Sequence, residues 1–251
     1  MLKIDFNMRK KREHKDNGVV IATVVIAIAF VISLGYLLGG DNIVSAVFQE
    51  KSDGATFYFL STDTFDDVTI ARQNAELIRL RGGAGYVDMR EGNRVILAVY
   101  PDEQSAKSVY EKMGDNSVVM SAVSIPAVKI SLKNSKLNKA VEDGLKYFDI
   151  AFDTLYTMSN SLADGTMVVE DVKVQISVLT SKIEEIKSVF YENTSQADDE
   201  KITEIKVALV TCLALVDGVE IGGLATTLSS LRRQTVQLVY CHGALISQLA
   251  K

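Results

Sequence analysis

The 251-residue chain is poor in the side chains that carry most metal and redox chemistry, with two histidines, two cysteines and no tryptophan. One histidine, His14, lies in a basic N-terminal tail, so His242 is the only one left for the rest of the chain. This leaves little material for a histidine-rich metal site or a hydrolase triad. We therefore expect no catalytic residue, no metal and no cofactor, and a protein that is not an enzyme.

The two cysteines are not expected to form a disulfide. If the last two predicted helices fold back at Gly222 and Gly223, Cys241 lies ~12 Å beyond the position opposite Cys212, whereas a disulfide needs Cα atoms within ~7 Å. We expect two buried free thiols. His242 lies on the apolar stripe of the last helix, where a core histidine with a satisfied hydrogen bond is expected.

The chain also lacks an excess of positive charge, because 27 basic residues face 32 acidic ones and the net charge is −5. The first 17 residues carry six basic and three acidic side chains, a charge of +3, so the remainder carries −8. This balance argues against nucleic acid as a partner of the body of the protein. The basic tail is expected to set membrane topology and to meet anionic headgroups.

One long hydrophobic run is present, Val19–Leu38, with twenty residues and no charge. A helix of that length covers ~30 Å, the hydrocarbon thickness of a bilayer. Basic residues precede it, and Lys51 is the only basic residue among the twenty residues after it. The positive-inside rule therefore predicts a single-pass protein with a cytoplasmic N-terminus and an extracytoplasmic body. A cleaved signal peptide with a late small-residue site at Val44–Ala46 is the alternative.

The sequence divides into five predicted segments. They are a cytoplasmic basic tail (1–17), a transmembrane helix (18–38), a linker (39–54), a sheet domain (55–130) and an all-α antiparallel helical bundle (134–251).

Within the sheet domain, four strand-like runs alternate with two helical patterns that follow the candidate N-caps Asp67 and Asp102. The order is βαββαβ, and Ala71 and Ala106 are the small inward residues that begin each helix. This layout predicts an α+β fold of the ferredoxin-like type, with four antiparallel strands and two helices on one face. The glycine run 82–85 follows a helix and precedes a strand, so it is interpreted as a C-cap and turn, not a phosphate loop.

From residue 134 the hydrophobic spacing is purely helical. Three stripes with spacings of 3 and 4 cover 172–190, 202–219 and 224–249, which indicates amphipathic helices joined by short loops. Whether residues 198–250 form one helix or two stays open at this point.

Alternation along the strands separates the two faces of the predicted sheet. The side expected to meet the two helices carries Leu60, Val87, Val95, Leu97 and Val99. The other side carries Phe57, Phe59, Ser61, Tyr86, Asp88, Arg90, Arg94 and Ile96. Aromatic rings beside arginines on an open sheet suit a sugar chain. The alternative is that the C-terminal bundle covers this face, which makes Phe57 and Phe59 core residues.

Residues 56–125 resemble the SPOR domain, a peptidoglycan-binding module of bacterial cell-division and sporulation proteins. The resemblance is carried by three stretches: Phe59–Phe65 followed by Ala71, Gly85-Tyr86, and Arg94–Tyr100 followed by Ala106. The chain departs from the family pattern at Ser61, where glutamine is common, at Asp63 and Ala98, which replace turn glycines, and at Val99, which replaces a proline.

The resemblance implies binding of glycan strands that lack stem peptides, through the sheet face. Ser61, Tyr86 and Arg94 are the matching positions, and Phe59 and Arg90 complete the candidate site. The chain is then expected to be a glycan-binding protein of the bacterial cell membrane, linked to cell division or sporulation, whose bundle binds an unknown protein partner. The alternative is a structural scaffold of a membrane complex in which the sheet face packs on the bundle and binds no glycan.

Overall fold

The computed structural model describes residues 54–90, 92–114, 117–128, 130, 132 and 135–250. Every described element lies within residues 52–251, which form one compact unit. The predicted tail and transmembrane segment lie outside the described residues. Among the helices that are described, none is both long and apolar enough to cross a bilayer.

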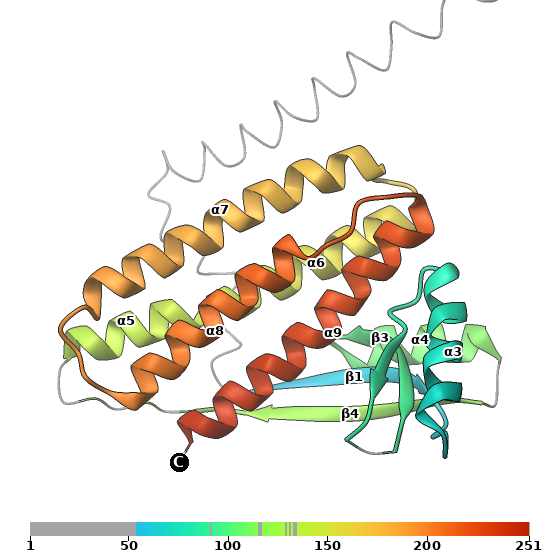
Figure 1. The fold of residues 1–251 in the computed structure, drawn as a ribbon, viewed down its shortest axis with the longest axis horizontal. Helices are drawn as coiled ribbons and strands as arrows, with labels where there is room; N and C mark the ends of the chain where they lie inside the picture. Colours follow the sequence, from blue (N-terminus) through green and yellow to red (C-terminus); the bar gives the residue numbers. More distant parts are fainter. Residues whose placement is uncertain are drawn as a thin grey trace, which may run out of the picture. The chain divides into compact units, whose positions relative to one another are not determined.

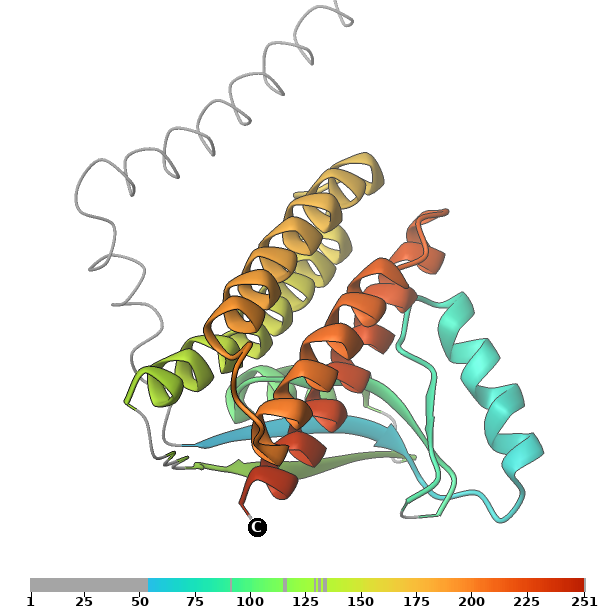
Figure 2. The ribbon, with the colours of Figure 1, turned by 60° about the vertical axis from the view of Figure 1, so that its left-hand side comes forward.

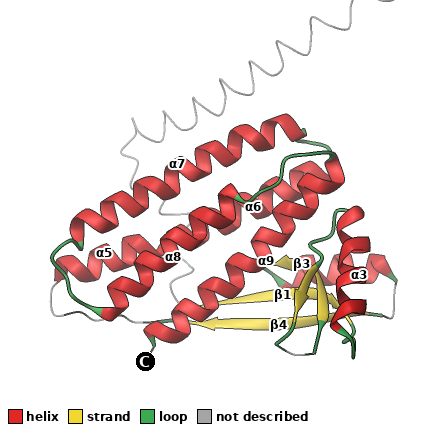
Figure 3. Ribbon diagram, in the orientation of Figure 1, coloured by secondary structure: helices red, strands yellow, loops and turns green. Residues whose placement is uncertain are grey.

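The first part of the described chain forms a four-stranded antiparallel sheet with two helices (Figure 3). Its elements are β1 (Gly54–Thr62), α3 (Val68–Leu80), β2 (Tyr86–Asp88), β3 (Arg94–Tyr100), α4 (Glu103–Met113) and β4 (Val118–Pro126). The strand order is β2-β3-β1-β4, and each neighbouring pair is antiparallel. The predicted mixed fold with a four-stranded antiparallel sheet is confirmed.

Local sequence explains where the two helices begin and how closely they pack. The Asp67 carboxylate accepts a hydrogen bond from the Thr69 amide (2.6 Å), and Asp102 accepts one from the Ser105 amide (2.8 Å). Each of these bonds satisfies an N-terminal amide that has no partner inside its helix. Ala71 and Ala106 are fully buried, so both helices lie close on the sheet as expected.

A β-bulge changes the predicted alternation in β3. Leu60 of β1 pairs with Ala98, but Ser61 pairs with Ile96, so Leu97 is an extra residue. Beyond the bulge the side chains exchange faces. The prediction that Val99 faces the two helices is therefore wrong, because Val99 belongs to the hydrophobic cluster on the opposite face.

The glycine run ends α3 and leads into β2, as the sequence indicates. The Gly82 amide donates to the Arg79 carbonyl (2.9 Å), and the Gly83 amide donates to the Ile78 carbonyl (3.0 Å). Gly85 has a positive φ of 53°, and a Cβ there would lie only 2.4 Å from the Ala75 carbonyl oxygen. The turn therefore requires glycine for steric reasons.

The second part of the described chain is helical. It contains α5 (Ser135–Leu145), α6 (Tyr147–Ala163), α7 (Val169–Asn193), α8 (Glu200–Asp217) and α9 (Leu224–Leu249). Residues 198–250 thus hold two helices, which settles the question that the sequence left open. α7 and α8 run antiparallel, since Thr180 bonds Asp217 (2.9 Å) at one end and Lys206 lies over the Tyr191 ring (5.2 Å) at the other.

The last helix joins the two parts. α9 contacts β3, β4 and α3 on one side and α6 and α8 on the other, so it lies between the sheet and these helices (Figures 1 and 2). Side chains of β1, β3 and α9 belong to the same hydrophobic cluster as those of α5–α8. The sheet therefore has α3 and α4 on one face. The other face is covered by α9 and, at Phe57, by Phe148 and Phe152 of α6.

Candidate functional site on the sheet face

The five residues predicted to bind glycan come together on the sheet face that α9 covers. Phe59 and Ser61 lie on β1, Tyr86 on β2 and Arg94 on β3, and Arg90 follows β2. Both β1 side chains are fully buried. The alternative in which the bundle covers this face therefore describes the arrangement in the structure.

Tyr240 of α9 is the centre of the contact between helix and sheet. Its ring stacks on Phe59 with the ring centres 5.2 Å apart, and it lies 5.7 Å from the Tyr86 ring. The Arg90 guanidinium carbon lies 3.2 Å from the centre of the same ring, an arrangement in which a cation is attracted to the face of the π-system. The rings and the guanidinium that were expected to meet a sugar thus have a partner within the chain.

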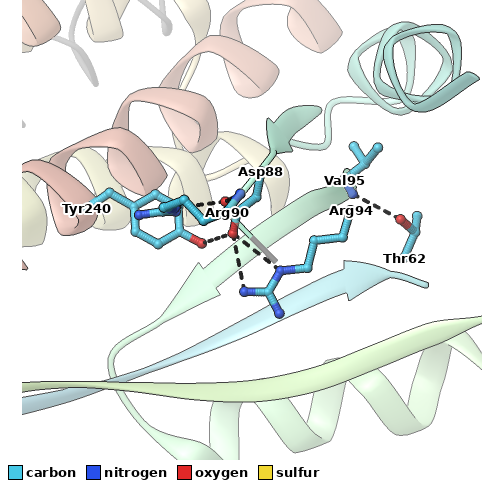
Figure 4. A network of polar contacts seen from close by, with 6 residues as sticks. All are labelled: Thr62, Asp88, Arg90, Arg94, Val95 and Tyr240. Carbon is cyan, nitrogen blue, oxygen red and sulfur yellow. Dashed lines mark hydrogen bonds and ion pairs between the residues drawn. The ribbon is translucent and has the colours of Figure 1, made fainter. Parts of the chain in front are cut away.

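Beside Tyr240, the carboxylate of Asp88 accepts hydrogen bonds from the polar groups of this face (Figure 4). Its Oδ1 accepts hydrogen bonds from the Arg90 amide (3.1 Å) and Nε (2.8 Å). Its Oδ2 accepts from Arg94 Nε (3.3 Å) and Nη2 (3.2 Å) and from the Tyr240 hydroxyl (3.0 Å). The Asp88 side chain is only 2% exposed, so its charge is stabilised by these donors in place of water. We call Asp88, Arg90, Arg94 and Tyr240 the Asp88 network.

The electrostatics of the network favour the ionised carboxylate. Burial by itself raises the pKa of Asp88, but the hydrogen bonds and charge of Arg90 and the Tyr240 hydroxyl outweigh it and hold this pKa below its usual value. Burial also raises the pKa of Tyr240, and the neighbouring Asp88 charge raises it further. Tyr240 therefore stays protonated and serves as a hydrogen-bond donor to Asp88.

One further hydrogen bond joins two strands beside the network. The Val95 amide donates to the Thr62 hydroxyl (3.0 Å), which ties the start of β3 to the end of β1 beside Arg94 (Figure 4). The Ser61 hydroxyl, in contrast, is buried and has no hydrogen-bond partner among the described residues. Ser61, which was expected to contact glycan, is thus not exposed, and its hydroxyl bonds no described residue.

His242 and the two cysteines have surroundings that make their side chains less reactive than they are in water. His242 stacks on Phe148 with the ring centres 3.9 Å apart, and its Nδ1 lies 3.2 Å from the Tyr147 hydroxyl, as expected for a core histidine. Burial lowers the pKa of His242 to about 3 and raises that of Cys212 to about 12. Cys241 is exposed, so the prediction of two buried thiols is wrong for this residue.

In the described part of the chain, no three His, Cys, Asp or Glu side chains lie close enough together to hold a metal ion. The acidic group of the candidate site, Asp88, has all its hydrogen bonds to residues of its own chain. This arrangement therefore supports an intramolecular contact that holds α9 on the sheet.

The residue that sequence reasoning missed is Tyr240, which lies between Leu238 and His242 and off the stripe that they define. A signal was present in the composition of the helix. The 26 residues of α9 contain two charged side chains, Arg232 and Arg233, and no acidic one. A helix with so few charges is typical of one that is buried on more than one side.

No protein-family model, no curated protein and no solved structure matches this chain.

Proposed function

We propose that this protein is a non-enzymatic interaction scaffold of a bacterial membrane complex, anchored through residues 19–38 with its body outside the cytoplasm. The sheet, with its βαββαβ order, is interpreted as a ferredoxin-like, SPOR-like domain whose outer face packs on the helical bundle (α5–α9) and binds no glycan. The observation that carries the proposal is α9, which lies on Phe59 and completes the Asp88 network.

The free energy of uncovering the face supports a structural role for it. Uncovering this face would expose Phe57, which packs on α6, together with Phe59 and Ile96. Each is at most 1% exposed, and exposure costs about 1.5–3 kcal/mol per side chain. The sum is comparable to the whole stability of many domains, which is about 5–15 kcal/mol. Glycan binding through this face, the competing function, would have to repay that cost and the loss of the Asp88 network.

The bundle supplies a surface suited to a protein partner. Five valines on α7 and α8 are 48–64% exposed. They are Val174, Val178, Val189, Val207 and Val210, and we call them the valine face. Val174, Val178 and Val207 lie on the side of their helix opposite the buried stripe, and Val189 and Val210 flank it, so the two neighbouring helices both direct apolar side chains outward.

α8 gives the strongest indication that this surface is covered in an assembly. Its residues 207–216 carry no charge, and both its buried side and its exposed side are apolar. A helix that is apolar all round is normally buried on all sides. Val207 and Val210 therefore mark α8 as the contact for a partner protein, which agrees with the predicted partner-binding role of the bundle.

The role of the sheet face is tested with a cross-link that fixes α9 on the sheet. A Cβ at Gly243 would lie 3.7 Å from Ile125 Cγ1, so Gly243→Cys combined with Ile125→Cys, in a Cys241→Ser background, places two thiols across the contact. The full chain is incubated with amidase-treated wall sacculi before and after oxidation, beside Arg94→Ala. We expect retention to be independent of both changes. Retention that disappears on oxidation and in Arg94→Ala would show that the face opens to bind glycan.

The role of the valine face is tested in the native membrane complex. Val207→Asp with Val210→Asp should reduce the mass of the cross-linked complex toward that of the single chain, because each aspartate must be desolvated at the contact. Leu77→Asp on α3 is the control, since Leu77 is equally exposed but lies outside the valine face. The proposal fails if the control and the double variant give complexes of the same mass.

A further inference from the structure

A groove between α4 and α6 is independent of both the sheet face and the valine face. It is shallow and open to solvent, with a volume of about 420 Å³, enough space for a small molecule. The side chains that matter for its chemistry are Tyr100, Asp102, Gln104, Ser108, Tyr156 and Asn160. They include phenols, a hydroxyl, two amides and one carboxylate.

The fold brings these side chains together from three elements. Gln104 and Ser108 are four residues apart on α4, and Tyr156 and Asn160 are four residues apart on α6, so each pair lies on one face of its helix. Tyr100 ends β3 between them. Its ring meets the Tyr156 ring at 82° with the centres 6.2 Å apart, so the two aromatic planes form a corner.

Most polar side chains of this groove are not used by the protein, and the exception is Asp102, whose carboxylate accepts the hydrogen bond of the Ser105 amide. Tyr100 is 9% exposed, yet its hydroxyl makes no hydrogen bond to any residue that the structure describes. Over the same described residues, the Tyr156 hydroxyl and the side-chain amides of Gln104 and Asn160 also make none. The Tyr100 ring is largely buried, but its hydroxyl is not among the buried polar atoms that lack a partner, so it reaches the open space of the groove and is available to a ligand.

The inner end of the groove extends to a cationic group. A cavity of about 10 Å³, the size of one water molecule, is lined by Tyr100, Tyr156 and Asn160 of the groove and by Arg232 of α9. Arg232 Nη1 donates to the Gly82 carbonyl (3.0 Å), which fixes the guanidinium in place. Burial raises the pKa of Tyr100, so its hydroxyl stays protonated and can donate.

The chemistry of the lining selects one class of ligand. Phenols, hydroxyls and amides each donate and accept hydrogen bonds, as a hydroxyl-rich ligand requires. The two tyrosine rings offer flat surfaces to the C–H face of a sugar ring. Asp102 and Arg232 carry opposite charges, so the lining favours neither an anion nor a cation, and a single carboxylate is too few for a metal site. We propose that this groove binds one uncharged sugar residue of a saccharide.

This inference does not rest on the proposed scaffold function, and the two fail separately. Sheet-face glycan binding requires Arg94 and is blocked by the α9 cross-link, whereas binding in the groove requires Tyr156 and Asn160 and is unaffected by either change. Retention on wall glycan that persists in Arg94→Ala and is lost in Tyr156→Ala would identify the groove as the site.

The test uses the full chain in detergent micelles, titrated with neutral trisaccharides (chitotriose, maltotriose and cellotriose) and with trigalacturonic acid as the anionic control. NMR follows the side-chain amide signals of Gln104 and Asn160, which are assigned by substitution. We expect one neutral trisaccharide to shift both signals with saturation below about 10 mM, and trigalacturonic acid to shift neither.

Variants make the result specific to the groove. Tyr156→Phe keeps the ring that stacks on Phe152 and removes only the hydroxyl, so the fold is retained and affinity should fall about three- to tenfold. Asn160→Ala should weaken binding by a similar factor, whereas Tyr191→Phe, on α7, should change nothing. The proposal is overturned if no neutral trisaccharide shifts the two signals, or if Tyr156→Phe and Asn160→Ala bind as tightly as the wild type.

Discussion

The two faces of the sheet are buried by different means. On one face, α3 and α4 pack through small alanines against aliphatic strand residues such as Val95 and Leu60. On the other, α9 packs through stacked aromatic rings and the Asp88 network. The first face is apolar and the second carries a carboxylate and two arginines, yet Phe59 and Leu60, adjacent on β1, are both at most 1% exposed. A polar sheet face is therefore not by itself an open one.

The largest effect expected from this comparison comes from truncation of the two adjacent core residues. Phe59→Ala should lower the free energy of unfolding by about 3–5 kcal/mol, because a buried ring is removed beneath α9. Leu60→Ala, on the opposite face, should cost about 2–5 kcal/mol. Urea unfolding of the full chain measures both. A cost below about 1 kcal/mol for Phe59→Ala would mean that its face is open to solvent.

The next effect concerns the charge that distinguishes the two faces. Asp88→Ala should destabilise the fold by about 2–3 kcal/mol, since Arg94 and the Tyr240 hydroxyl lose their buried partner. The matched control is Asp66→Ala, an exposed aspartate whose loss should cost under about 0.5 kcal/mol. The same unfolding measurement separates them. Equal costs for the two substitutions would remove the network as a stabilising feature of the contact.

A smaller effect is the pH dependence that α9 confers. The folded pKa of His242 is about 3, below the value of ~6.5 in an unfolded chain, so the unfolded state binds a proton that the folded state excludes. Stability from this group is therefore full above pH ~6.5 and declines as the pH falls toward 3. From pH 7 to pH 5 the decline should be about 2 kcal/mol.

His242→Leu tests the origin of that decline. The variant should unfold with nearly the same free energy at pH 7 and at pH 5, whatever its absolute stability, because the group that titrates in this window is absent. Thermal unfolding at the two pH values gives the comparison. If the variant keeps the full wild-type pH dependence, the protons are taken up elsewhere.

Much of the fold follows from local sequence. Asp67 and Asp102 predict where α3 and α4 begin, and Ala71 and Ala106 mark where these helices approach the sheet most closely. Alternation along the strands also predicts that the residues of the candidate site share one face of the sheet, as they do in the structure. These features are readable because capping and alternation depend only on residues that are near one another in the sequence.

The features that sequence did not reveal depend on distant contacts. The bulge that moves Val99 to the other face is a matter of pairing between β1 and β3, which no local pattern encodes. The cover over the sheet comes from Tyr240, more than 150 residues after Asp88 along the chain. The groove likewise joins Tyr100 to Tyr156 and Asn160 from separate elements. Alternation assigns a residue to a face but does not say what packs on that face.

The most direct test of the covered face is thiol labelling of Ser61→Cys in a Cys241→Ser background under native conditions. Ser61 is fully buried and lies two residues after Phe59 on the same side of β1. Its hydroxyl has no partner, so the substitution removes no hydrogen bond among the described residues. We predict that this thiol reacts no faster than the chain unfolds globally, whereas exposed Cys241 of the wild type reacts at once. Labelling of Ser61→Cys as fast as that of Cys241 would contradict a sheet face closed by α9.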